Sequence, residues 1–340
     1  MIRFVICGVG HIGRRHAALV ARRPGAALVA LIEPRAAVAA EVAAEFGVPV
    51  FSALEEYLAA GPAADVLTVA TPNGTHAELA VRALRAGLHV VIEKPLAIRR
   101  TDAELIVHTA LDTGRRVFGV MQNRYSPPAA WLKQVVSEGR LGRIHLVQLT
   151  CLWNRDARYY QPGSQPDAWR GTRHLDGGTL FTQFSHFIDL LYWVFGDVAN
   201  IQSRFFDFAH GHLTEFEDSG LVTFELVRGG AGVLHFSTAV WDRNLESSIT
   251  VVAEHGSVKL GGQYLNKVEV CHIRDYTLPD LPPTNPANHY GAYQGSAANH
   301  VQLIDNVLDV LSGGSPVSTN ALEGLKVVDI IERMYAAGGR

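Results

Sequence analysis

The sequence predicts an α/β protein in which a doubly wound parallel sheet precedes an α+β domain with an open, mainly antiparallel sheet. Up to residue 122, short β-branched runs alternate with alanine-rich stretches, as expected of βαβ units. A glycine-rich turn directly follows the first of these runs. After residue 140 the β-branched runs lengthen and tight-turn signals join neighbouring runs, which is typical of antiparallel strands.

The first domain, residues 1–122, contains five β-branched runs separated by helical stretches. We expect its strands at 3–7, 27–33, 66–70, 89–93 and 116–121. We expect its helices at 11–23, 35–46, 52–60, 75–87 and 101–113. Alternating strands and helices of these lengths predict a parallel sheet with helices on both faces.

The second domain, residues 123–340, has longer strands and few helices between them. We expect strands at 143–153, 198–208, 218–227, 231–240, 247–253, 256–260 and 266–273. One helix, 178–195, ends at Gly196 and interrupts this series, and helices at about 295–312 and 321–337 close the chain. The loop 278–286 contains four prolines and is too polar to form part of the core.

Composition restricts the class of protein. The chain has 340 residues, enough for about two domains that each bury a core. Its formal net charge of -3 gives no support to a nucleic acid or an anionic membrane as partner. Apolar runs are shorter than the roughly 20 residues of a membrane span. Only six residues separate Met1 from the glycine turn, which leaves no room for a signal peptide, so we expect a cytoplasmic protein.

The cysteines and histidines do not predict a metal site. Cys7, Cys151 and Cys271 lie far apart and form no C-x-x-C pair, as expected of free thiols in a reducing compartment. No group of Cys, His and Asp has the spacing of a metal site. We therefore predict that the protein uses no metal.

The glycine turn Gly8-Val-Gly10-His-Ile-Gly13 predicts a dinucleotide site. Gly8 permits the tight turn, Gly10 lets a pyrophosphate approach, and Gly13 lets the helix pack closely on the strand. Glu33 ends the second strand, where an acidic side chain would accept hydrogen bonds from the adenosine ribose. Glu33 favours NAD over NADP, although Arg35 nearby could instead hold a 2′-phosphate.

Two further segments follow parallel strands, at the sheet edge where such sheets bind ligands. They are Thr71-Pro-Asn-Gly-Thr-His76 and Glu93-Lys94-Pro95. Pro95 disfavours helical geometry at Lys94. A lysine that is partly desolvated beside a cofactor can exchange protons near neutrality. Alone, a Glu-Lys-Pro tripeptide would usually be a solvated turn, but its position after a strand predicts a chemical role.

The expected helix 178–195 carries a polar face. Thr182, His186 and Asp189 stand at i, i+4 and i+7, after two glycines that would allow a substrate to approach closely. A lone histidine on a mostly apolar helix is more often a satisfied core residue than a ligand-binding one. Asp189, one turn beyond His186, could fix the tautomer of the imidazole.

These motifs, with Gln122-Asn-Arg-Tyr-Ser-Pro127, occur in an order that resembles the glucose-fructose oxidoreductase/inositol dehydrogenase/rhizopine catabolism (Gfo/Idh/MocA) family. The resemblance implies a Rossmann domain, a second domain with an open sheet, and NAD(P)-dependent oxidation or reduction of a sugar or polyol. It implies that Lys94 and His186 are the catalytic pair. Many members have an aspartate where this chain has Thr182, which leaves Lys94 or His186 as the proton acceptor.

On the motifs and this resemblance we assign the sites. We expect NAD to be bound by Gly8, Gly10, His11, Ile12, Gly13, Glu33, Arg35, Ala70, Thr71, Pro72, Asn73, His76, Glu93, Lys94 and Gln122. We expect the substrate to be bound by Lys94, Asn123, Arg124, Tyr125, Arg155, Trp169, Arg170, Arg173, Thr182, Gln183, His186 and Tyr290.

Cations and aromatic residues gather before the His186 helix. Arg155, Arg158, Arg170 and Arg173 alternate with aromatic side chains, and guanidinium groups bind carboxylate and phosphate in bidentate fashion. We therefore predict an anionic substrate. The alternative is a solvated loop whose arginines pair with nearby aspartates.

Within the family, the segment 184–196 is most similar to dehydrogenases of surface-polysaccharide pathways. That similarity implies oxidation at C3 of a nucleotide-linked amino-sugar uronate such as UDP-N-acetylglucosaminuronic acid. The alternatives are a dehydrogenase of a free polyol or sugar, a hydrolase that uses NAD transiently, and a non-catalytic NAD(H)-binding sensor. Because the open sheet would leave an exposed face, and family members commonly self-associate, we expect a homodimer or homotetramer.

Overall fold

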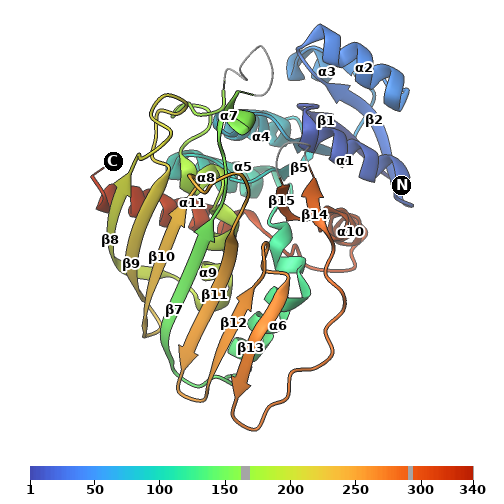
Figure 1. The fold of residues 1–340 in the computed structure, drawn as a ribbon. Helices are drawn as coiled ribbons and strands as arrows, with labels where there is room; N and C mark the ends of the chain where they lie inside the picture. Colours follow the sequence, from blue (N-terminus) through green and yellow to red (C-terminus); the bar gives the residue numbers. More distant parts are fainter. Residues whose placement is uncertain (162–168, 290–293, 340) are drawn as a thin grey trace. The chain divides into compact units, whose positions relative to one another are not determined.

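The computed structural model describes residues 1–161, 169–289 and 294–339, and it divides into two compact units (Figure 1). The first unit comprises Met1–Val120 and His300–Val328. The second comprises Met121–Asn299 and Asp329–Arg340. The chain first passes from the first unit to the second after Val120, two residues before the expected domain boundary at 122/123. The segment His300–Val328 then belongs to the first unit again.

The first unit is built on a six-stranded parallel sheet with the order β3-β2-β1-β4-β5-β6. The strands are β1 (Ile2–Cys7), β2 (Ala26–Ile32), β3 (Val50–Phe51), β4 (Val66–Val69), β5 (His89–Ile92) and β6 (Val117–Gly119). The order reverses direction between β1 and β4, which is the point where doubly wound sheets bind ligands. The predicted fold of this part is confirmed, and the two-residue β3 is the strand that the sequence did not predict.

Helices connect these strands. They are α1 (His11–Arg22), α2 (Ala36–Phe46), α3 (Leu54–Ala60), the short 3-10 helix η1 (Asn73–Thr75), α4 (His76–Arg85) and α5 (Arg100–Thr113). Helix α1 packs with α2 and with α10 (His300–Leu311), whereas α4 packs with α5. The return of the chain therefore adds a helix to the α1 side of the unit.

The second unit is built on a seven-stranded sheet with the order β13-β12-β11-β7-β10-β9-β8. Its strands are β7 (Ile144–Leu152), β8 (Val198–Phe206), β9 (Ser219–Leu226), β10 (Ala231–Ser237), β11 (Glu246–Ala253), β12 (Gly256–Gly261) and β13 (Lys267–Ile273). Every neighbouring pair is antiparallel except β7 and β10, which are parallel. The predicted mainly antiparallel sheet is thus confirmed.

Helices cover one face of this sheet (Figure 1). The short elements are η2 (Gln122–Tyr125), α7 (Ala157–Tyr160), α8 (Thr179–Thr182), β14 (Ala287–His289) and β15 (Gln294–Ala297). The longer helices are α6 (Pro127–Ser137), α9 (Ser185–Phe195) and α11 (Ala321–Ala337), which lie behind the sheet in Figure 1. The side chains of Phe184 and Phe236 join this layer to the sheet, with ring centroids 5.4 Å apart.

The opposite face of the sheet leaves apolar side chains exposed. Leu146 on β7, Leu221 on β9 and Val252 on β11 share this face and are 42%, 51% and 40% exposed. Among the described residues, no helix is long and apolar enough to cross a membrane.

The expected helix 178–195 is wrong as a single helix. Helix α8 ends at Thr182 and α9 begins at Ser185, so Thr182 and His186 do not share a helix. The bounds of the other predicted strands and helices agree with the structure to within five residues, because burial follows the periodicity of apolar residues. The sequence did not predict helices α6 and α7 or strands β14 and β15.

Candidate functional site

The glycine turn of the first unit has the shape of a dinucleotide-binding loop. Gly8 has φ +84°, a left-handed conformation that favours glycine. A Cβ on Gly13 would collide with the carbonyl oxygen of Gly8, so the start of α1 packs directly on the turn. A Cβ on Gly10 would meet nothing within 4 Å. The loop is therefore tight on its inner side and open at Gly10, which fits the approach of a pyrophosphate at the N-terminus of α1.

Glu33 lies beside this turn, at the end of β2. Its carboxylate accepts hydrogen bonds from the Val9 amide at 3.0 Å and from the Arg35 Nε at 2.7 Å. Burial alone would raise the pKa of Glu33, but the hydrogen bonds from Arg35 and Val9 together lower it. The carboxylate is thus ionised and buried, while the Arg35 side chain is 56% exposed.

The segments after β4 and β5 meet the glycine turn at the same edge of the sheet. The space that a Cβ on Gly8 would need is occupied by the Ala70 carbonyl and the Thr71 side chain. The buried His76 side chain contacts the Thr71 carbonyl at 2.9 Å and the Pro95 carbonyl at 2.8 Å. The first unit therefore brings together the predicted cofactor residues that follow β1, β2, β4 and β5.

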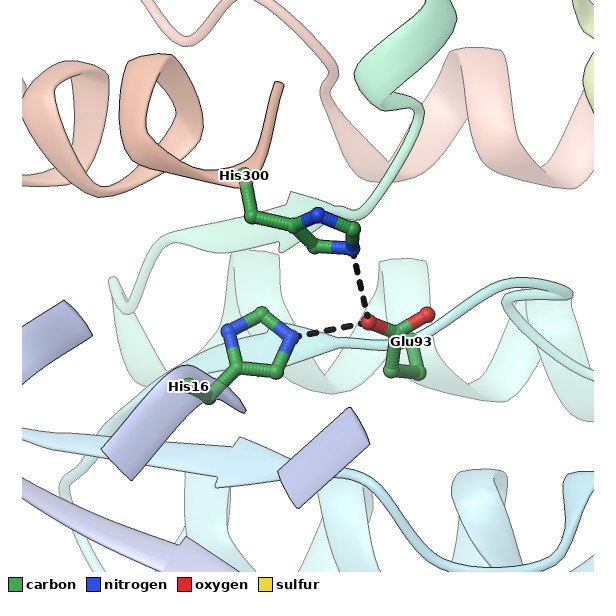
Figure 2. Close-up of side chains that lie close together, drawn as sticks. All are labelled: His16, Glu93 and His300. Carbon is green, nitrogen blue, oxygen red and sulfur yellow. Dashed lines mark hydrogen bonds and ion pairs between the residues drawn. The ribbon is translucent and has the colours of Figure 1, made fainter. Parts of the chain in front are cut away.

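Lys94 is half-buried at this edge, with Glu93 buried next to it. Glu93 Oε1 lies 2.8 Å from His16 Nε2 and 3.8 Å from His300 Nε2 (Figure 2). Glu93 Oε2 accepts the Lys94 amide at 3.1 Å. Burial alone would raise the pKa of Glu93, but the hydrogen bond from His16 and further favourable electrostatic interactions lower it to about 2. Glu93, predicted as a cofactor residue, points into the protein toward two histidines.

His186 lies on α9 in the second unit and is 2% exposed. Gly178, the second of the two glycines before α8, has a role that differs from the expected one. The space that a Cβ would take on Gly178 is occupied by the Tyr335 hydroxyl, which accepts the Leu180 amide at 3.0 Å and donates to Glu217 Oε1 at 2.6 Å. Gly178 therefore makes room for Tyr335 rather than for a substrate.

Arg124 and Asp189 form a buried ion pair that joins η2 to α9. Arg124 Nε and Nη2 donate to Asp189 Oδ2 and Oδ1 at 2.8 and 2.6 Å, and the guanidinium lies 5.4 Å from the Trp193 ring centroid. The predicted substrate residue Arg124 is thus bound bidentately by Asp189. The acid predicted to orient His186 therefore anchors the segment that carries Gln122 and Asn123.

The predicted arginine cluster is only partly formed. Arg155 is buried among aromatic rings, 4.8 Å from the Trp153 centroid and 5.3 Å from that of Tyr159. Its Nε donates to Gln183 Oε1 at 2.7 Å. Arg170 stacks on the same Tyr159 ring at 4.9 Å. Two guanidinium groups therefore share one aromatic ring.

Two of the four arginines differ from this picture. Arg158 is exposed and pairs with Asp156 and Asp242, as the alternative interpretation of a solvated loop expected. Arg173 is also exposed, and its amide donates to Glu215 at 2.7 Å. Trp169 lies beside Arg170, with the guanidinium 5.3 Å from its ring centroid. The predicted substrate residue Tyr290 lies outside the described residues.

Three predicted ligand-binding residues, Gln122 for the cofactor and Asn123 and Gln183 for the substrate, present buried polar atoms. Within the described part of the chain, Gln122 Oε1, Asn123 Oδ1 and Gln183 Nε2 have no hydrogen-bond partner. Buried polar atoms are nearly always paired in folded proteins, with the protein, with water or with a ligand. All three belong to the second unit, so this unit retains hydrogen-bonding capacity for a polar ligand.

The sequence did not single out two residues of the first unit. His16 and His300 lie far from Glu93 along the chain, and only folding brings their rings together, 5.4 Å apart. Their ligand atoms and that of Glu93 lie within 4.8 Å of one another. The sequence offered one signal for His16. It stands three residues after Gly13 on α1, on the buried side of the helix that faces the sheet.

Comparison with known proteins identifies the family. The model of an oxidoreductase family with an NAD-binding Rossmann fold, GFO_IDH_MocA, matches residues 2–120. The model of the GFO/IDH/MocA C-terminal domain matches residues 130–259. The chain belongs to the Gfo/Idh/MocA family. It is therefore an NAD-dependent oxidoreductase, and the open turn at Gly10 fits that cofactor.

Among solved structures, the chain is similar to two dehydrogenases in complex with ligands. It is 31% identical to the WlbA dehydrogenase of Bordetella pertussis in complex with NADH and UDP-GlcNAcA, with 99% of this chain and 96% of that chain covered and a TM-score of 0.86. The WlbA dehydrogenase of Chromobacterium violaceum, in complex with the same two ligands, is 30% identical, with 99% and 94% covered and a TM-score of 0.86.

A curated relative points to another substrate. The inositol 2-dehydrogenase of Rhizobium meliloti strain 1021 is 24% identical over 98% of this chain and 97% of its own length. The dehydrogenase activity is common to these relatives, whereas their substrates differ.

Proposed function

We propose that this Gfo/Idh/MocA protein is an NAD-dependent dehydrogenase that oxidises a ring hydroxyl, at C3, of a nucleotide-linked amino-sugar uronate such as UDP-N-acetylglucosaminuronic acid. Such a reaction belongs to the synthesis of polysaccharide precursors. The observation that carries the proposal is the pair of guanidinium groups, Arg155 and Arg170, stacked on Tyr159. Guanidinium groups bind carboxylate and phosphate groups, and a neutral polyol carries neither of these groups.

The cofactor is held by the first unit. The glycine turn would bind the pyrophosphate. The Glu33 carboxylate would accept hydrogen bonds from the hydroxyls of the adenosine ribose in place of the one from Arg35. Bound NAD would supply the hydride acceptor. Because Glu33 is ionised, it repels a 2′-phosphate, and we propose a preference for NAD over NADP.

The proton of the sugar hydroxyl is taken by Lys94 in this proposal, and His186 binds the same oxygen or relays its proton. General acid–base assistance is typically worth about 10²- to 10⁴-fold in rate. We expect Lys94→Ala and His186→Ala each to lower kcat by about that factor while the Kd for NADH stays nearly unchanged, since the glycine turn and Glu33 are untouched. Near-normal turnover by Lys94→Ala would mean that another group accepts the proton.

A substrate panel with NAD tests the substrate class. We expect the highest kcat/KM for UDP-N-acetylglucosaminuronic acid, ahead of UDP-N-acetylglucosamine, glucose and myo-inositol. Arg170→Ala should raise KM for the uronate by about 10- to 100-fold, the value of a charge-assisted hydrogen bond. Arg158→Ala is the matched control, because its charge is already paired with Asp156 and Asp242 and KM should not change.

The second candidate is a dehydrogenase of a free polyol, which the similarity to inositol 2-dehydrogenase favours. Best turnover of myo-inositol, together with unchanged KM in Arg170→Ala, would support that candidate and exclude the uronate.

We also propose that the protein is a cytoplasmic homodimer or homotetramer that associates through the exposed sheet face of Leu146, Leu221 and Val252. Exposed apolar side chains on one sheet face support this proposal. Leu221→Glu should lower the sedimenting mass of the protein, and an unchanged mass would exclude this face.

A further inference from the structure

A buried cluster of three titratable side chains lies under Lys94 in the first unit. His16 comes from α1, Glu93 follows β5, and His300 begins α10 (Figure 2). Their exposed fractions are 0%, 6% and 1%. A carboxylate this deeply buried is costly unless its oxygens accept hydrogen bonds. The cluster must therefore be maintained by its internal contacts.

We infer that His16 and His300 are positioning residues that hold the Glu93 carboxylate, so that its second oxygen fixes the main chain of Lys94. The inference rests on the proposed role of Lys94 as proton acceptor. Glu93 Oε1 faces both imidazoles, at 2.8 and 3.8 Å, and Glu93 Oε2 accepts the Lys94 amide at 3.1 Å. One carboxylate oxygen of Glu93 thus faces the histidines, and the other accepts the hydrogen bond from the Lys94 main chain.

The proton positions follow from the surroundings of the imidazoles. Among the described residues, neither His16 Nδ1 nor His300 Nδ1 has a hydrogen-bond partner. An ionised carboxylate can only accept hydrogen bonds, so a ring nitrogen that hydrogen-bonds Glu93 must carry a proton. His16 Nε2, which hydrogen-bonds Glu93 Oε1 at 2.8 Å, therefore carries a proton.

The partners of Nδ1 also bear on whether these three ligand-type side chains bind a metal. A histidine that binds a metal through Nε2 carries its proton on Nδ1 and donates it to a carboxylate, carbonyl or water. The described surroundings give neither Nδ1 such an acceptor. The short His16–Glu93 distance is that of a hydrogen bond, and the cluster fits an orienting role.

The other side of the lysine is held as well. His76 contacts the carbonyl oxygen of Pro95, the residue after Lys94. It also contacts the carbonyl oxygen of Thr71, just after the end of β4. The Glu93-Lys94-Pro95 segment is thus fixed by buried histidines at both ends. A shift of about 1 Å in a catalytic group can cost about 10²-fold in rate, so such fixation matters for turnover.

The test compares His16→Leu, which removes the donor, with His16→Gln, whose amide can donate from nearly the same place. Hydrogen exchange at the Lys94 amide is measured without NAD, and kcat, KM and the Kd for NADH are measured with it. We expect His16→Leu to speed exchange by about 3- to 10-fold, the value of one hydrogen bond. We expect kcat to fall by about 10- to 100-fold with KM and Kd nearly unchanged.

His16→Gln should restore both exchange and kcat toward the original values. If His16→Leu does not fold, His300→Leu carries the same test with the weaker of the two contacts. Unchanged exchange and kcat in a folded His16→Leu protein would overturn the inference, and so would one equivalent of zinc, iron or manganese in the purified protein. Near-normal turnover of Lys94→Ala would instead overturn the proposed function and leave the exchange result standing.

Discussion

Asp189→Ala should destabilise the second unit strongly, because it leaves the Arg124 guanidinium buried without its carboxylate. The two side chains are 5% and 0% exposed and share two hydrogen bonds of 2.8 and 2.6 Å. Breaking a buried pair by removing one partner typically costs about 3–5 kcal/mol. We expect a loss of that size in the free energy of unfolding, or about 10²- to 10³-fold or more in the folding equilibrium constant.

Tryptophan fluorescence during urea unfolding measures this loss selectively. All five tryptophans of the chain belong to the second unit, and Trp193 lies beside Arg124. The control is the double variant Arg124→Met, Asp189→Leu, which removes both charges and should cost less than Asp189→Ala alone. A loss below about 1 kcal/mol for Asp189→Ala, or a double variant as unstable as the single one, would refute the reasoning.

Three further predictions concern the first unit. Gly10→Ala should weaken NADH binding in calorimetry by about 10-fold or more without changing the thermal midpoint, because the space beside Gly10 is used by the ligand and not by the protein. Gly13→Ala should also lower the thermal midpoint, because its Cβ would collide with the Gly8 carbonyl. Glu33→Gln should narrow the preference for NADH over NADPH, since it removes the charge that repels the 2′-phosphate; an unchanged ratio would exclude Glu33 as its source. Burial lowers the pKa of His300 from 6.5 to about 3, so unfolding takes up a proton below pH 6.5 and stability falls as the pH drops. We expect circular dichroism to show a loss of about 2 kcal/mol between pH 7 and pH 5, and a smaller loss in His300→Gln.

The fold was predictable where local periodicity and turn chemistry agree. The order of strands and helices up to residue 122 follows from β-branched runs and glycines, and the structure confirms it. The helix 178–195 was predicted as continuous because its apolar pattern persists, but the backbone breaks between Thr182 and Ser185. The pattern records which residues are buried, and residues stay buried on both sides of a break.

The site was predictable only as far as it depends on neighbours in the sequence. The glycine turn and the acid after β2 are local features, and the structure places them side by side through the Val9–Glu33 hydrogen bond. The Arg124–Asp189 pair and the filling of Gly178 by Tyr335 join residues far apart in the chain. Such pairings depend on how the elements pack, which spacing along the sequence does not encode.

The origin of the hydride tests the proposed reaction most directly. UDP-N-acetylglucosaminuronic acid carrying deuterium at C3 is incubated with the protein and NAD, and the NADH formed is analysed by mass spectrometry, with the C4-labelled sugar as control. We predict NADH that is heavier by one mass unit from the C3-labelled sugar and unlabelled NADH from the control. Unlabelled NADH from the C3-labelled sugar, or no NADH from this sugar while myo-inositol yields it, would contradict the proposed function.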